Sequence, residues 1–298
     1  MENFILIFIC LAGGMLLQGR KIFAENAPQT LNLYVIWVAL PALILRQVPT
    51  LSFSTDLFVL LVMPWLMTLL GAILVWLGSR FFKWSTEITG VLLLTVPLGN
   101  TSFLGIPMIE AFFNLDMVSY GIIYDQFGSF LALSTYGSFI FALYSGQEQQ
   151  NVWKIGQKVL TFPPFLALLI AILFARPLQN AVISESLSLI ASSVVPVVMF
   201  AIGLQLKIRL APGQTLPFCF GLTVKMLVAP FVALLLCHLS GLDTPASRIA
   251  VFESGMPPMV TAGALAMSAG LAPRLTAALV GWGILISFAT LSLLRFFL

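Results

Sequence analysis

The strongest constraint on this chain is a series of ten apolar segments, each close to the length of a membrane-spanning helix. A helix needs about 20 mostly apolar residues to cross the hydrocarbon core of a bilayer. The segments run over residues 3–19, 30–47, 56–79, 87–113, 118–145, 155–175, 183–206, 215–240, 246–268 and 273–297. We therefore expect an all-α, polytopic membrane protein with ten transmembrane helices.

The composition agrees with a membrane protein and disfavours several other classes. Of 298 residues, 60% are hydrophobic and only 8% are charged, whereas soluble domains carry about 25% charged residues. The small net charge of +3 gives no indication of a nucleic-acid partner. The three cysteines are scattered without metal-ligand spacing, and there is a single histidine, so we expect no disulfide framework, no metal site and no cofactor.

The distribution of lysine and arginine predicts the orientation, because cytoplasmic loops carry an excess of these residues. With the N-terminus outside, nine fall in the inner loops and four in the outer loops and C-terminus. We therefore expect both termini outside. Arg20 and Lys21 follow the first apolar segment rather than precede it, so this segment is expected to be a retained helix rather than a cleaved signal peptide.

A short polar loop at residues 146–154 divides the chain into two halves of five predicted helices, 1–145 and 155–298. Prolines recur at matching positions in the second and seventh, the third and eighth, and the fourth and ninth helices. Because five is odd, the second half would enter the membrane from the opposite side. The expected architecture is a 5+5 inverted repeat, which is typical of secondary transporters.

The fourth and ninth helices are expected to be broken near their middle, because proline removes a backbone donor and glycine relaxes the chain. The residues at these breaks are Pro97, Gly99, Gly105, Pro107, Pro257 and Pro258. Unwound backbone is tolerated at membrane depth only where it is buried in protein or lines a watery cavity. A broken helix at this depth therefore indicates a transporter's binding site. The alternative is a simple proline kink repaired by neighbouring helices.

The two breaks carry a family resemblance. The stretch from Pro97 to Pro107, followed by Glu253-Ser-Gly-Met-Pro257-Pro258, resembles the motifs of the auxin efflux carrier family of membrane transporters. The similarity extends over the whole chain, and the short central loop is similar to that of prokaryotic members rather than plant ones.

The resemblance implies how the helices would work. Helices 1, 2, 6 and 7 would form a scaffold and a homodimer surface. Helices 3–5 and 8–10 would form a transport domain that moves like an elevator, with helices 4 and 9 crossing at the substrate site. The asparagine at the first break contacts the substrate carboxylate in that family, and the matching residue here is Asn100.

The residues themselves support the same prediction. A half-helix N-terminus carries partial positive charge and unpaired N–H groups, which suit a carboxylate. The expected substrate-binding residues are Asn100, Thr101, Ser102, Gln126, Val260 and Thr261. The alternative for Asn100 is that its side chain only repairs broken backbone hydrogen bonds.

Three ionisable residues, Asp125, Glu253 and Lys225, lie within predicted membrane helices, where each charge is costly and therefore a functional candidate. Desolvation favours the neutral form of a carboxyl group, so Asp125 or Glu253 could bind a coupling proton. Lys225 could neutralise a carboxylate of the substrate or of Asp125. The alternatives are a structural role for the two acids, which would satisfy backbone groups near the crossover or pair with Lys225, or a lysine that extends to the membrane interface.

We therefore expect a secondary transporter of small organic anions, such as dicarboxylates or auxin-like acids, in a bacterial inner membrane. Its partners would be the organic anion, the lipid bilayer and a second copy of the chain, with H⁺ or Na⁺ as the coupling ion. A sodium-coupled symporter resembling the bile-acid carriers is an alternative, and a passive channel is another. An intramembrane enzyme is disfavoured because the chain has no HExxH, no GxGD and no histidine–cysteine cluster.

Overall fold

The computed structural model describes residues 2–20, 22–51, 54–145 and 152–298. Every secondary-structure element assigned in these residues is a helix. Six helical stretches are long and apolar enough to cross a membrane: Ala27–Thr50, Thr55–Phe82, Leu115–Ser145, Ala181–Gln205, Thr215–Leu239 and Pro273–Arg295. The other four predicted segments contain shorter apolar helices or pairs of helices. The chain is thus an all-α, multi-pass membrane protein.

The predicted sixth helix, 155–175, is wrong as a single element. It is divided into α10 (Val152–Leu160) and α11 (Pro163–Leu173). Proline is favoured in the first turn of a helix because its missing N–H needs no partner there, and Pro163 and Pro164 begin α11. Helix α10 starts inside the range predicted as the central loop; residues 146–151 of that loop lie outside the described residues.

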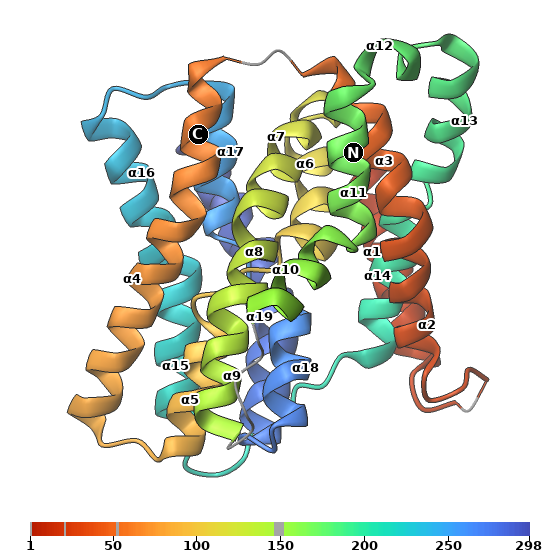
Figure 1. Cartoon of the computed structure of the whole chain (residues 1–298). Helices are drawn as coiled ribbons and strands as arrows, with labels where there is room; N and C mark the ends of the chain where they lie inside the picture. The colour runs from red at the N-terminus through yellow and green to blue at the C-terminus, as the bar shows by residue number, and fades with distance from the viewer. Residues whose placement is uncertain (1, 21, 52–53, 146–151) are drawn as a thin grey trace.

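The helices pack in two groups that lie side by side (Figure 1). The first group comprises α1 (Glu2–Leu17), α2 (Ala27–Tyr34), α3 (Leu40–Gln47), α11, α12 (Ala175–Leu178), α13 (Ala181–Ala191) and α14 (Val194–Gln205). In it α1 packs along α14, and α3 packs against α11 and α13. Gly14 and Gly203 let the backbones of α1 and α14 come close together, since a Cβ added to Gly203 would lie 2.9 Å from the Gly14 Cα.

The second group comprises the remaining helices apart from α10 (Figure 1). Its N-terminal members are α4 (Phe58–Phe82), α5 (Thr86–Thr95), α6 (Ile106–Phe112), α7 (Val118–Tyr124), α8 (Phe130–Ala132) and α9 (Ser138–Ser145). Its C-terminal members are α15 (Thr215–Thr223), α16 (Ala229–Leu239), α17 (Pro245–Ser254), α18 (Val260–Ser268) and α19 (Pro273–Arg295). Helix α4 packs against α17, and α5 packs against α9 and α18.

Short π-helical stretches interrupt the long helices at positions that the sequence did not reveal. In the described residues they are η1 (Val35–Ala39), η4 (Thr101–Gly105), η6 (Asp125–Ser129), η7 (Leu133–Gly137) and η8 (Val224–Val228). Such π-turns occur frequently at functional sites. Four of them carry buried polar residues, which include Thr101, Asp125, Ser134 and Lys225.

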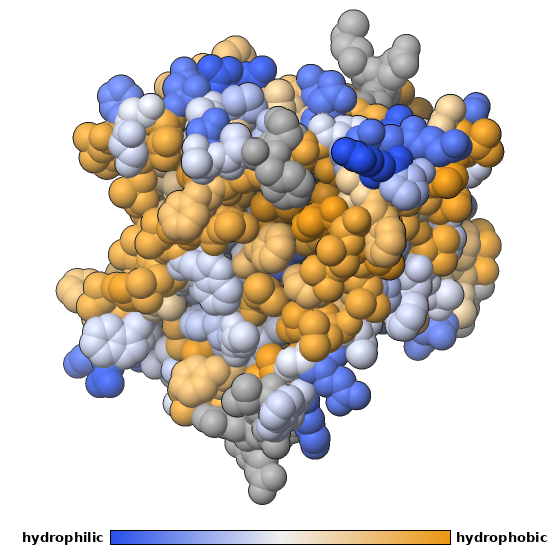
Figure 2. Space-filling view, turned by 45° about the horizontal axis from the view of Figure 1, so that its top comes forward, coloured by the Kyte–Doolittle hydropathy of each residue, from blue (hydrophilic) through white to orange (hydrophobic). Residues whose placement is uncertain are grey.

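The outer surface carries a broad apolar band with polar residues above and below it (Figure 2). Large apolar side chains such as Phe58, Leu69 and Phe231 are more than half exposed. A soluble monomer rarely exposes so much contiguous apolar surface, and the band corresponds to the part of the protein that contacts lipid.

Candidate functional site

The chain leaves the helical conformation twice near the middle of the second group, between α5 and η4 and between α17 and α18. The two non-helical segments bond to each other as a short antiparallel bridge between Gly99 and Pro258. The Asn100 N–H donates to the Pro257 carbonyl oxygen at 2.8 Å, and the Met259 N–H donates to the Leu98 carbonyl oxygen at 2.9 Å. Backbone groups freed by each break therefore find partners in the other, as burial requires.

The side chain of Asn100 takes no part in this backbone repair. The backbone carbonyl oxygen of Asn100 accepts hydrogen bonds from the N–H groups of Leu104 and Gly105 at 3.3 and 3.0 Å. Its side-chain nitrogen, Nδ2, is buried and has no hydrogen-bond partner within the described structure. A buried amide that lacks a partner costs free energy unless something else satisfies it, so this donor is available for a ligand.

Asp125 connects the first break to the helical stretch from Leu115 to Ser145. The Thr101 hydroxyl donates to Asp125 Oδ1 at 2.5 Å, and Gln126 Nε2 donates to Asp125 Oδ2 at 2.7 Å. All three side chains are at most 2% exposed. Each oxygen of the carboxylate therefore has a donor, which offsets part of the cost of burying it.

A small cavity of about 150 Å³ lies against these residues. Polar side chains of Asn100, Ser102, Asp125, Ser134 and Thr261 line it, and its remaining wall is apolar and aromatic. A single buried water needs only about 15 Å³ of such space, so the cavity has room for a small polar group of a solute. The Ser134 hydroxyl, like Asn100 Nδ2, is buried without a partner in the described residues.

Lys225 lies on the opposite side of the first break. It is 4% exposed, and its ammonium nitrogen, Nζ, is 3.4 Å from the carbonyl oxygen of Ser254 at the end of α17. A Cβ added to Gly99 would lie 3.0 Å from Nζ. The alternative of a lysine that reaches the membrane interface is wrong, because the ammonium group is enclosed behind the break.

Glu253 is completely buried, and neither of its carboxylate oxygens has a hydrogen-bond partner in the part of the chain that the structure describes. Glu253 therefore makes no hydrogen bond to Lys225, and the two side chains interact only through their charges. The carboxylate occupies space left by two glycines: an added Cβ would lie 2.5 Å from Glu253 Oε2 at Gly105 and 3.2 Å from Oε1 at Gly121.

The predicted site residues divide into three sets. Asn100, Ser102 and Thr261 line the small cavity, together with Asp125. Thr101 and Gln126 donate hydrogen bonds to the Asp125 carboxylate. Val260 lines a second, larger cavity of about 460 Å³ that shares Thr261 with the small one.

Sequence reasoning missed Ser134 and the π-turns. Ser134 is a small polar residue whose sequence position alone does not show that its side chain faces the cavity. Only the inward direction given by η7 brings it to the cavity. The polar character of the fifth predicted helix was a usable signal, since Ser129, Ser134 and Thr135 follow Asp125 and Gln126 closely.

A multi-pass helical membrane protein with a buried polar cavity beside two interrupted helices has the features of a membrane transporter. Comparison with known proteins agrees. The chain belongs to the membrane transport protein family that includes the auxin efflux carriers, whose model matches residues 1–295.

Two archaeal relatives are similar over most of their length. An uncharacterized transporter of Methanothermobacter thermautotrophicus is 24% identical over 295 residues, covering 98% of this chain and 96% of the relative. An uncharacterized transporter of Methanocaldococcus jannaschii is 25% identical over 266 residues, covering 86% of this chain and 85% of the relative. The family and these names indicate transport rather than catalysis.

Proposed function

We propose that this protein is a secondary transporter that carries small organic anions, such as dicarboxylates or auxin-like acids, and binds their carboxylate at Asn100. The observation that carries the proposal is the buried Asn100 Nδ2, a donor without a partner in the wall of a polar cavity. Deep in a protein such a donor favours an acceptor-rich group, and a carboxylate offers two oxygens.

The electrostatics around the cavity support an anion. Helix α18 begins at Val260 beside the cavity, and its free N–H groups and positive dipole end favour negative charge. Lys225 adds a full positive charge behind Gly99. Asp125 opposes this, but donors from Thr101 and Gln126 occupy both of its oxygens.

The packing of the helices supports alternating access by relative motion of the two groups. The small cavity lies at their boundary: Ile36 and Leu40 come from the first group, while Asn100, Asp125 and Thr261 come from the second. In the proposed elevator mechanism the first group is the scaffold and the homodimer surface, and the second group carries the site across the membrane. The two interrupted helices are the crossing members of a 5+5 inverted repeat, with both termini outside.

We assign proton coupling to Glu253. Burying an ionised carboxylate without hydrogen-bond donors costs free energy. The missing donors at both Glu253 oxygens therefore support a protonated, neutral carboxyl group in the present conformation. When Glu253 is protonated, the remaining buried charges are the negative Asp125 and the positive Lys225. An anionic substrate then meets one buried negative charge rather than two. A sodium-coupled symporter is the second candidate, because the same unpartnered oxygens of Glu253 could ligate a cation.

The test is thermal unfolding of the purified protein with a panel of mono- and dicarboxylates that includes indole-3-acetate, with and without sodium, at two pH values. A ligand at 100 times its Kd stabilises the folded state by about 2.7 kcal/mol. We expect a shift with selected carboxylates that Asn100→Ala abolishes and that lower pH enhances.

Asn26→Ala is the matched control, because this asparagine is exposed and its side chain makes no helix cap. A shift that survives Asn100→Ala would remove the assigned site. Shifts with cations or neutral solutes alone would contradict the substrate class. Sodium dependence without pH dependence would favour the symporter, and conduction without substrate counterflow would indicate a channel.

A further inference from the structure

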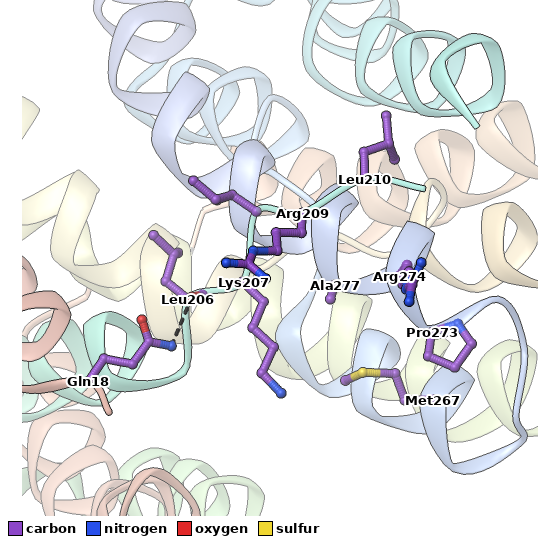
Figure 3. A pocket seen from close by; sticks show the side chains of 10 residues that line it. Gln18, Leu206, Lys207, Arg209, Leu210, Met267, Pro273, Arg274 and Ala277 are labelled. Atoms are coloured by element: carbon purple, nitrogen blue, oxygen red, sulfur yellow. Dashed lines mark hydrogen bonds between the residues drawn. The ribbon is translucent and has the colours of Figure 1, made fainter. Parts of the chain in front are cut away.

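A second feature of the molecule is a wide cavity of about 740 Å³ with a strongly basic mouth (Figure 3). Lys207, Arg209 and Arg274 line it, and no acidic residue of the described part of the chain does. All three cations are exposed. The ion pair found in the described residues, between Arg248 and Asp243, involves none of them, so the positive charge of the mouth is uncompensated by nearby carboxylates.

The chain segment that carries two of these cations is fixed on both sides. It follows α14 and leads to α15. Gln18, the residue after the end of α1, donates a hydrogen bond to the Leu206 carbonyl oxygen at 3.0 Å (Figure 3). Trp282 of α19 donates to the Ile208 carbonyl oxygen at 2.9 Å. The cations therefore project from an anchored backbone rather than from a free loop.

The basic cavity is the first of three neighbouring cavities that lead to Asn100. It shares Lys207, Met267 and Ala277 with the 460 Å³ cavity. That cavity in turn shares Phe103 and Thr261 with the small cavity that Asn100 lines. The shared walls place the three spaces in sequence, from the exposed cations to the buried amide.

We infer that Lys207, Arg209 and Arg274 form an entrance site, which attracts soluble organic anions into this series of cavities and raises their local concentration before they reach Asn100. The inference rests on the proposed function. Clefts lined with one sign of charge focus the electric field and accelerate the arrival of oppositely charged ligands. The entrance lies on the side that the lysine and arginine distribution predicts to be cytoplasmic.

The potential at the entrance can be measured without knowing the substrate. Ala277 lines both the basic and the middle cavity, and we replace it with cysteine after substituting the native Cys10, Cys219 and Cys237. The new thiol is then modified by an anionic reagent, 2-sulfonatoethyl methanethiosulfonate, or by its cationic trimethylammonium counterpart. The readout is the ratio of the two rates, normalised to the ratio for a small free thiol.

We expect the normalised ratio to favour the anionic reagent on the order of 20- to 60-fold at low salt, because three charges about 10 Å away in water accelerate the anion and slow the cation by a similar factor. Because mobile ions screen exposed charges, the preference should fall towards one at high salt in the same protein. The triple variant K207Q/R209Q/R274Q should lose it at every salt concentration. As a matched control, R80Q/K83N/K154Q removes three other exposed cations and should keep it.

Equal rates for the two reagents in the parent protein, or a preference that survives the triple variant, would overturn the entrance site. A thiol that reacts with neither reagent would overturn it too, because the cavity would then be closed to solutes.

Anionic lipid headgroups are the other possible source of negative charge. A preference that appears in phosphatidylcholine nanodiscs but vanishes with phosphatidylglycerol would assign the mouth to lipid and contradict the proposal. Persistence in both supports a soluble anion. The labelling uses no substrate, so its failure is separate from a failure of the carboxylate-binding test at Asn100.

Discussion

At the scale of single residues, the centre of this protein is defined by which polar groups have partners and which do not. Asp125 has a donor on each oxygen, whereas Asn100 Nδ2 and both oxygens of Glu253 have none among the described residues. Native proteins leave few buried polar groups unpaired, so each exception needs an explanation. The proposed ligand binding at Asn100 and the proposed proton binding at Glu253 would supply one.

Gly105→Ala tests whether the space around Glu253 is as tight as the geometry indicates. The added Cβ would lie 2.5 Å from Glu253 Oε2, and both the helix and the carboxylate are buried. We expect a loss of about 1–3 kcal/mol in the free energy of unfolding, which is typical of overpacking. The measurement is chemical or thermal denaturation in detergent.

Gly156→Ala is the control for this substitution, since an added Cβ there meets nothing within 4 Å. In an exposed helix interior, alanine is favoured over glycine by about 1 kcal/mol, so stability should be unchanged or slightly higher. An unaltered unfolding free energy in Gly105→Ala would show that Glu253 can move away easily.

At the scale of elements, close helix contacts form where side chains are absent. Helices α1 and α14 approach through Gly14 and Gly203, a use of small residues that is common in membrane helix interfaces. The two interrupted helices associate differently, because their unwound backbones form hydrogen bonds with each other. Without such pairing, the freed N–H and C=O groups would be unsatisfied in hydrocarbon.

Gly203→Ala should separate α1 from α14. Its Cβ would lie 2.9 Å from the Gly14 Cα and close to other α1 backbone atoms, which cannot rotate aside as a side chain can. We expect a loss of about 1–3 kcal/mol of stability, measured by denaturation of the purified protein. Gly13→Ala is the neighbouring control, because its nearest contact is an ordinary 3.8 Å to the Phe200 ring; equal effects of the two substitutions would contradict the close contact.

At the scale of the whole molecule, the polar cavity lies at the boundary of two helix groups, and this is what alternating access requires. Contacts between the groups run through pairs such as α1 with α6 and α14 with η4. If the groups slide past each other, the site at Asn100 changes the side to which it opens. In the proposed mechanism, the coupling proton on Glu253 would travel within the moving group.

Glu253→Gln tests proton coupling, since glutamine has nearly the same shape and cannot release a proton. In proteoliposomes, an imposed gradient of one pH unit should drive about tenfold accumulation of a carboxylate for one coupled proton. The variant should retain substrate exchange and lose this accumulation. Glu185→Gln, at an exposed position on α13, should behave like the parent protein, and pH-driven accumulation by Glu253→Gln would assign the proton to another group.

The sequence by itself determined that this is an all-helical membrane protein, because the length and apolarity of its segments leave no other way to satisfy the backbone in lipid. It also indicated both helix interruptions, since proline and glycine act locally. Only the tertiary structure decided that Asn100 Nδ2 lacks a partner among the described residues and that Lys225 is enclosed. It also decided that the cavity at Asn100 shares lining residues with a second cavity, and the second with the basic one. These properties depend on contacts between residues far apart in the chain, and the local sequence does not specify them.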